Sequence, residues 1–266
     1  METSLALSLA ALAALIPATV LPYRHLPSRN SAFWLFLGVA VAGPLLWIWV
    51  SFSPGWQTGL ASALWVTVAA SLLLFAILSA TVREVWRLAP LLLPYLLVIG
   101  VMATLWLHRP GHVIPTMALS SWVEVHIAVS IVTYALLTIG AIAGFAVMLQ
   151  ERALKTKRPT RLTRILPSVA DGEAIQVRLL LAGALILGVN LLSGMAAQYF
   201  LTGELLALNH KVAFSLVTFV IIVGLLMVHA LTGIRGRRTG RAILAAYLFI
   251  TLAYPGVKFV TDVILT

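Results

Sequence analysis

Long apolar stretches, each about as long as a bilayer is thick, dominate this sequence of 266 residues. A helix needs about 20 apolar residues to cross the hydrocarbon core of a membrane, and eight stretches reach roughly that length: 4–22, 31–50, 59–80, 88–107, 119–149, 177–199, 210–232 and 241–264. Hydrophobic residues make up 61% of the chain and charged residues 10%, whereas soluble domains contain roughly 45–50% and about 25%. This composition excludes a water-soluble globular protein and predicts an integral membrane protein.

The stretches favour an all-α fold over a β-barrel. Barrel strands are about 9–11 residues long and alternate between apolar and polar side chains, whereas these stretches are longer and do not alternate. We therefore expect a polytopic transmembrane helical bundle of about eight helices. The connections are too short for a soluble domain, so residues 1–266 are expected to form a single integral membrane domain, with four helices in 1–117 and a second part in 118–264.

Basic residues gather in the connections on one side of the expected bundle. With eight crossings, 15 of the 18 Lys and Arg residues fall on that side, and only Arg109, Lys211 and Lys258 fall on the other. Lysine and arginine accumulate on the cytoplasmic side of membrane proteins. Both termini are therefore expected outside, in the periplasm, with the chain as a multi-pass protein of the bacterial cytoplasmic (inner) membrane. The net charge of +10 belongs to these loops, and no basic tail indicates nucleic acid binding.

Two absences in the sequence limit its chemistry. The chain has no cysteine, which excludes disulfides, thiol catalysis and thiolate-bound metal sites. None of its eight acidic residues falls near the middle of an apolar stretch, where an ion-coupled carrier usually needs one. No nucleophile triad or phosphate-binding loop is visible either. No catalytic residue is therefore predicted, and any metal chemistry would depend on histidine, methionine, tyrosine or carboxylate side chains.

Six histidines remain as possible metal ligands: His25, His108, His112, His126, His210 and His229. His210 and His229 lie 19 residues apart in one stretch, and at roughly 1.5 Å per residue they are about 28 Å apart, too far to bind one ion. His126 and His210 lie near the outer ends of two different stretches, so they can meet at similar depth. Two imidazoles on opposite faces of a planar macrocycle are a reasonable ligation for haem iron.

The turns around His126 allow a ligand interpretation and a structural one. Ser130, Thr133 and Tyr134 continue its helix face as a partly polar stripe, and Trp122 lies one turn above it. As a cofactor site, this face would include His126, Trp122 and Tyr134. In the structural alternative, His126 hydrogen-bonds a neighbouring helix and Trp122 belongs to the aromatic belt at the membrane interface. The spacing does not choose between them.

The run WVEVHIAVSIVTYALLTIGAIAGFAVMLQERALK, at 122–155, resembles a segment of the cytochrome c assembly (CcsA/CcmC) family. In that family a histidine opens a helix at the outer side, and a Gln-Glu-Arg-x-Leu-Lys patch closes it. The resemblance continues through a leucine–proline linker and a Gly-Arg-Arg connection, at Leu166, Pro167, Ser168, Asp171 and the run from His229 to Ala242. The sequences NHK at 209–211 and LAYPGVKFV at 252–260 resemble a small YpjD-like branch. Together these matches cover roughly residues 118–264.

The resemblance assigns roles to three histidines. His126 matches the family's first outer haem ligand, His229 matches its membrane-embedded histidine, and His210 matches a histidine of the small branch. Larger members hold haem against a tryptophan-rich outer loop and use a second outer ligand that follows the embedded histidine. Here the loop SGMAAQYFLTGELLALNHK has no tryptophan, and no histidine follows His229. His25 is a candidate partner for His229.

Two functions follow as expectations. The first is a haem-handling inner-membrane protein that uses His126 and His210 as candidate iron ligands, with Trp122 and Tyr134 beside them and His229 as an inner transit position. It would present haem at the periplasmic side, and covalent attachment would need the thiols of a partner such as an apocytochrome c, or another membrane subunit. The alternative is a haem-free accessory or regulatory subunit of an inner-membrane transport or ion-homeostasis system, which the missing tryptophan loop favours.

Overall fold

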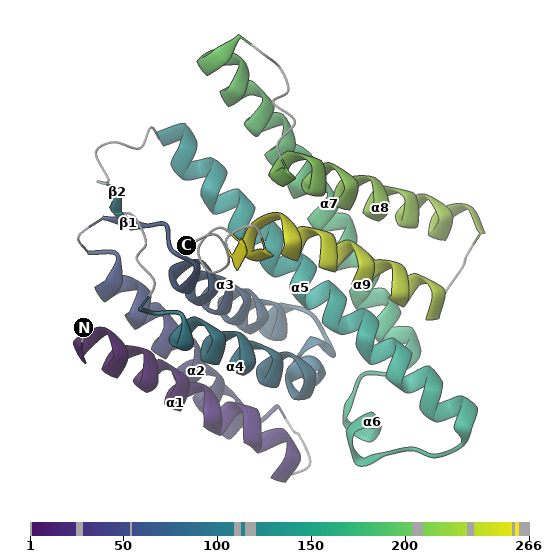
Figure 1. Cartoon of the computed structure of the whole chain (residues 1–266). Coiled ribbons are helices and arrows are strands. Elements are labelled where there is room, and N and C mark those ends of the chain that lie inside the picture. Colours follow the sequence, from purple (N-terminus) through teal and green to yellow (C-terminus); the bar gives the residue numbers. More distant parts are fainter. Residues whose placement is uncertain are drawn as a thin grey trace.

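The computed structural model of the chain describes residues 2–24, 29–53, 55–108, 113–114, 121–203, 210–232, 237–256 and 259–260. Its elements are helices joined by mostly short connections, with two very short strands (Figure 1). In chain order they are α1 (Glu2–Arg24), α2 (Ser31–Ser51), β1 (Trp56–Gln57), α3 (Leu60–Thr81), the 3-10 turn η1 (Val85–Leu88), α4 (Ala89–Leu105), β2 (Val113–Ile114), α5 (Ser121–Thr156), α6 (Arg161–Ile165), α7 (Val169–Thr202), α8 (His210–Thr232), α9 (Arg237–Thr251) and the π-helical turn η3 (Leu252–Gly256).

The expected all-α membrane bundle is confirmed. Within the described ranges, seven helical segments are long and apolar enough to cross a membrane: α1, α2, α3, η1 with α4, α5, α7 and α8. The expected eighth crossing, 241–264, corresponds to α9 and η3. Helix α9 has 15 residues, fewer than the roughly 20 of a full crossing, and most positions after Gly256 lie outside the described residues. The chain is therefore a multi-pass membrane protein.

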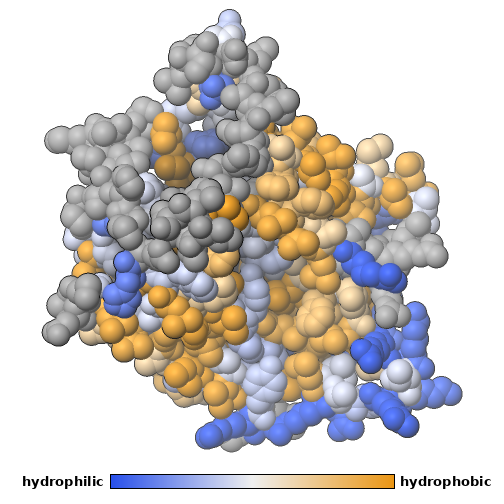
Figure 2. All heavy atoms as spheres, in the orientation of Figure 1, coloured by the Kyte–Doolittle hydropathy of each residue, from blue (hydrophilic) through white to orange (hydrophobic). Residues whose placement is uncertain are grey.

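Hydrogen bonds join the basic connections at one end of the bundle, which we call the basic end. The Arg29 guanidinium donates to the carbonyl of Ala80 at 3.0 Å, which ties the start of α2 to the end of α3. The Arg161 guanidinium donates to the carbonyl of Arg24 at 3.3 Å, which ties α6 to the end of α1. Hydrophilic atoms gather along the lower rim of the molecule, beneath an apolar body and on the side where α6 lies (Figures 1 and 2). The opposite end is called the far end.

The connection between α5 and α7 is fastened to the end of α5 by one side chain. The amide nitrogen of Gln150 donates to the carbonyls of Thr163, Leu166 and Pro167 at distances between 2.7 and 3.2 Å. Thr160 and Thr163 form a reciprocal capping box at the start of α6, which satisfies backbone donors that a helix end leaves free. The connection between α5 and α7 therefore has a defined fold.

A two-residue antiparallel pairing links two connections at the far end. Trp56 of β1 lies opposite Ile114 of β2, and Gln57 lies opposite Val113. The pairing joins the segment between α2 and α3 to the segment between α4 and α5. Each strand has only two residues, which is too short to show an alternation of polar and apolar side chains. The sequence pattern therefore does not predict these strands.

Helices α5 and α7 pack antiparallel, and glycines on α7 allow the close approach. Gly172, Gly183 and Gly194 are spaced 11 residues apart, close to three turns at roughly 3.6 residues per turn, so they share one face. A Cβ atom on Gly183 would lie 2.9 Å from Leu137 Cδ2, and one on Gly172 would lie 2.8 Å from Val147 Cγ2. A larger residue at either position would therefore force the two helices or the facing side chains apart.

Two groups of buried apolar side chains meet at α5 and α7. The first fills the space among α1, α2, α3 and α4 and reaches α5 and α7, with Trp65, Phe75 and Leu92 fully buried. The second joins α5 and α7 to α8 and α9 and includes Ile222 and Ile243. Helices α5 and α7 therefore hold the two parts of the bundle together, and α5 also carries Trp122, His126 and Tyr134 of the expected site.

Candidate functional site

His126 lies between α5 and α7 at the far end of the bundle. Its Nδ1 is 3.2 Å from Ser193 Oγ, and its ring lies beside Gly194, where a Cβ atom would be 3.3 Å from His126 Cε1. Trp122 donates its indole N–H to the carbonyl of Ser193 at 3.4 Å and leaves 54% of its surface exposed. Within the part of the chain that the structure describes, His126 Nε2 has no hydrogen-bond partner. Ser193 thus brings His126 and Trp122 together.

The polar stripe expected below His126 is present, and its partners lie on α7 and α9. Asn190 Nδ2 donates to Ser130 Oγ at 2.9 Å, one turn below His126. The hydroxyl of Tyr134 lies 3.1 Å from Thr251 Oγ1, a further turn below. Polar groups in a membrane need partners because water is absent there. Each of these side chains has one, which fixes α5 to its two neighbours.

Tyr134 belongs to a cluster of hydroxyl groups where α4, α5 and α9 meet. The hydroxyls of Tyr95 and Tyr247 are 2.5 Å apart, and the Tyr247 hydroxyl donates to that of Tyr134 at 3.3 Å. Thr138 donates to the Tyr247 hydroxyl at 3.1 Å. The cluster lies on the seam between the two apolar cores. Tyr134 is eight residues, or about 12 Å along the helix, from His126, and its hydroxyl joins helices there.

The length of α5 places His126 near a membrane surface. Helix α5 has 36 residues, and Arg152, near its basic end, is 26 residues from His126. At roughly 1.5 Å per residue this is about 39 Å, whereas the hydrocarbon core is about 30 Å thick. With Arg152 among the lipid headgroups of the basic end, His126 lies among the headgroups of the far end. A ligand there can exchange with water without crossing the bilayer.

The structure describes the other expected ligands only in part. His210 begins α8, but its side chain lies outside the described residues, so its pairing with His126 stays a prediction. Because α8 is continuous, the half-buried His229 is about 28 Å along the axis from His210 and belongs to another depth of the bundle. His25 also lies outside the described residues. Among the residues that are described, no three His, Asp or Glu side chains converge on a metal position.

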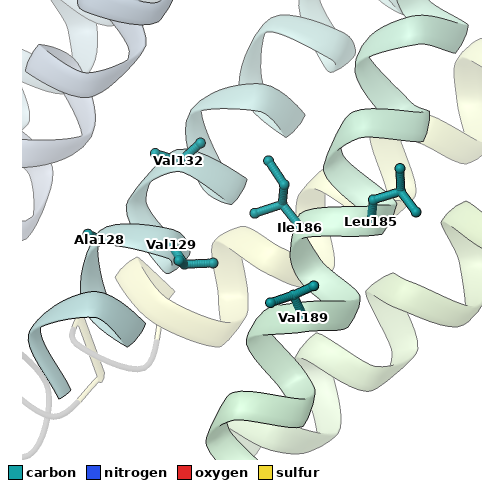
Figure 3. A pocket seen from close by; sticks show the side chains of 6 residues that line it. All are labelled: Ala128, Val129, Val132, Leu185, Ile186 and Val189. Atoms are coloured by element: carbon teal, nitrogen blue, oxygen red, sulfur yellow. The ribbon is translucent and has the colours of Figure 1, made fainter. Parts of the chain in front are cut away.

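An apolar groove runs between α5 and α7, beginning two residues after His126. Figure 3 shows the side chains of α5 and α7 that line it. Its volume is about 400 Å³, and it is lined by Ala128, Val129, Val132, Leu185, Ile186 and Val189. Leu185 and Val189 are 65% and 60% exposed. The groove is therefore an open surface feature that can take a hydrocarbon chain or one edge of a flat apolar ligand, with no polar group to orient it.

Three residues of α7 complete the arrangement and were not predicted from the sequence: Asn190, Ser193 and Gly194. A usable signal existed at Asn190, because a single amide within an apolar stretch requires a partner. Ser193 and Gly194 follow it by three and four residues, which places them on the same helix face. The direction of that face toward His126 depends on the packing of α7, which the sequence does not contain.

Comparison with known proteins identifies the family. The sequence model of the family described as "Cytochrome C assembly protein" matches residues 45–265. The chain belongs to the cytochrome c assembly protein family. A protein of Azospirillum brasilense, described as an uncharacterized 28.8 kDa protein in the nifR3-like 5' region, is 50% identical over 270 residues, with 100% of both chains covered. No solved structure matches the chain.

The family match reaches further than the motifs that suggested it. It includes α3 and α4, which carry none of those motifs, and it leaves out α1 and most of α2. Assignment of this cytochrome c assembly protein to the small YpjD-like branch stays a prediction. The site on α5 and α7 lies wholly within the matched range.

Proposed function

We propose that this cytochrome c assembly protein binds haem at the far end of the bundle, with His126 as an axial ligand of the iron. The observation that carries the proposal is the position of the His126 imidazole: Nδ1 meets Ser193 Oγ, and Nε2 has no hydrogen-bond partner among the described residues. Family membership supports it independently. We further propose that the far end faces the periplasm of a bacterial inner membrane.

Ser193 and Gly194 prepare the imidazole for this role. When the proton is on Nδ1, that nitrogen donates to Ser193 Oγ, 3.2 Å away, and Nε2 keeps its lone pair for a metal. Histidines that bind metals are commonly oriented by such a bond from the other ring nitrogen. Gly194 allows the ring to lie beside α7. With that tautomer, His126 is an oriented imidazole with a free lone pair on Nε2, which fits the requirement of haem for an axial ligand.

The remaining site residues have separate roles in the proposal. The half-exposed indole of Trp122 offers an aromatic surface beside His126, and His210 at the start of α8 is the candidate second ligand. Tyr134 supports the site by fixing α5 to α9, and His229 is a candidate transit position elsewhere in the bundle. Covalent attachment of haem needs thiols, and this chain has no cysteine. The thiols would therefore come from a partner such as an apocytochrome c, to which this site would present the haem.

Titration of haemin into the detergent-purified protein tests the proposal. The wild-type protein is expected to show a saturable Soret band with one haem per chain, because the proposed site at His126 holds a single iron. A protein that stays colourless when purified from haem-replete cells and does not bind added haemin would contradict the proposal and favour a haem-free accessory subunit with the same fold.

Changing Ser193 to alanine is expected to weaken haem binding about tenfold, because loss of an orienting partner commonly lowers metal affinity 10- to 100-fold. Ser193→Thr keeps the hydroxyl oxygen and is expected to restore most of the affinity. Haemin titrations of the three proteins measure the effect. Equal affinity of wild type and Ser193→Ala would show that Ser193 does not orient His126.

The proposed orientation makes a separate prediction. Alkaline phosphatase fused after Thr266 is expected to be active in intact bacterial cells, whereas the same enzyme fused after Arg158 in the α5–α7 connection is expected to be inactive, because basic connections stay in the cytoplasm. The reverse pattern of activity would place His126 at the cytoplasmic surface. Haem binding would then have to be reconsidered as an event on that side.

A further inference from the structure

A row of two arginines and three aromatic rings lies at the basic end, where α2 begins and α3 gives way to η1. Arg29 Cζ is 5.3 Å from the ring centre of Trp34. Phe33 meets Trp34 edge-on at 5.3 Å and Trp86 edge-on at 6.1 Å, so it joins the two indoles. Arg87 closes the row, with Cζ 5.3 Å from the ring centre of Trp86. Cation–π and aromatic contacts therefore hold two guanidinium groups at its ends.

The charges around this row do not balance. The Glu84 carboxylate is 2.7 Å from Arg87 Nε and 3.7 Å from Arg83 Nε. Arg29 donates to the carbonyl of Ala80, three residues before Arg83, so this end of α3 brings three arginines and one carboxylate into the same region. The Arg83 side chain is 95% exposed. We call Arg29, Phe33, Trp34, Arg83, Glu84, Trp86 and Arg87 the arginine–tryptophan cluster.

An apolar strip leads up to the cluster along α3. Leu73 and Ile77 are 42% and 51% exposed, and with Ala80 they follow one another at helical spacing on one face. Ala80 is the residue whose carbonyl accepts the bond from Arg29. A single ligand could therefore place an anionic group on the arginines and a hydrocarbon chain on the strip.

We propose that the arginine–tryptophan cluster binds the phosphate of an anionic phospholipid such as phosphatidylglycerol, with an acyl chain along Leu73 and Ile77. Guanidinium groups bind phosphate oxygens through paired hydrogen bonds, and tryptophan is enriched at the level of lipid headgroups. A soluble phosphate or an acidic peptide could use the charges but would leave the strip uncovered. Three of the seven cluster residues, Arg29, Phe33 and Trp34, precede the family match, whereas the other four lie within it, so the site joins the N-terminal helices to the family core.

Lipid binding to the full chain in detergent tests the proposal. Native mass spectrometry and thermal unfolding would be followed with phosphatidylglycerol, with phosphatidylcholine of the same chain length, and with glycerol 3-phosphate. Phosphatidylglycerol is expected to bind and to raise Tm, and the other two are not. Each arginine near a membrane surface strengthens attraction to anionic lipid about fivefold. We therefore expect Arg29→Gln with Arg83→Gln to weaken phosphatidylglycerol binding about 25-fold.

A matched pair of substitutions controls for loss of charge. Lys157→Gln with Arg158→Gln removes two exposed cations from the same end of the bundle but outside the cluster. Because salt screens exposed charges that do not touch the lipid, this pair is expected to leave phosphatidylglycerol binding within about twofold of wild type. If the Arg29 variant does not fold, Arg83→Gln alone carries the test, with a fivefold loss expected. Equal losses in both pairs, equal binding of phosphatidylcholine, or stabilisation by glycerol 3-phosphate alone would overturn the proposal.

Discussion

Changing His126 to alanine is expected to lower haem affinity about a hundredfold, more than the tenfold expected for Ser193→Ala, since removal of a metal ligand should cost more than loss of its orienting partner. At haemin concentrations that saturate the wild-type protein, the His126→Ala variant is expected to show no Soret band. The effect should be on binding and not on folding, because His126 is only partly buried and, among the described residues, its side chain hydrogen-bonds only Ser193. Haemin titration and Tm measured on the same preparations separate the two.

His108 provides the matched control. It is an exposed histidine that follows α4 and belongs to neither the α5–α7 site nor the arginine–tryptophan cluster. His108→Ala is expected to bind haemin as tightly as wild type. If His108→Ala and His126→Ala lose affinity equally, or if neither does, His126 is not the ligand. Addition of imidazole offers a further check, because it can restore a Soret band when the site is intact except for its ligand.

Changing Gly183 to leucine is expected to lower the free energy of unfolding by about 1–3 kcal/mol, the usual cost of forcing extra carbon atoms into packed helices. The Cβ atom alone would lie 2.9 Å from Leu137 Cδ2, and three further carbons would follow it. Helices α5 and α7 would have to separate, which would also lengthen the distance between His126 and Ser193. Denaturant-induced unfolding in mixed micelles and haemin titration would both register the change.

Gly38 is the control for this substitution. It lies on an exposed face of α2, and a Cβ atom there would have no neighbour within 4 Å. Gly38→Leu is expected to unfold at the same denaturant concentration as wild type or a higher one, because leucine favours helix more than glycine does. A loss of stability in Gly38→Leu as large as in Gly183→Leu would mean that the loss comes from the helix itself and not from the α5–α7 contact.

The fold was largely predictable because a bilayer allows few solutions. Apolar length alone indicates the crossing helices, and the positions of arginines indicate which helix ends share a surface. The bond from Arg29 to Ala80 and that from Arg161 to Arg24 agree with this grouping. Contacts between distant side chains were not predictable. The tyrosine cluster joins Tyr95 to Tyr247, which are separated by 152 residues, and neither position breaks the apolar pattern of its stretch.

The residues of the candidate site on α5 were predictable from the sequence, whereas those on α7 were not. On α5, the four-residue spacing of His126, Ser130 and Tyr134 defines a polar face, and the contacts of these residues with α7 and α9 agree with it. On α7, Ser193 and Gly194 are small residues of a kind common in membrane helices, so nothing marks them as partners of a histidine. Only the packing of α7 on α5 shows their role.

An experimental structure of the haem-loaded protein measures the central claim most directly. We predict iron bonded to His126 Nε2 at the far end of the bundle, with Nδ1 still hydrogen-bonded to Ser193. Haem bound elsewhere, for example at His229, or a His126 ring whose Nε2 is occupied by a protein hydrogen bond while haem is present, would contradict the claim.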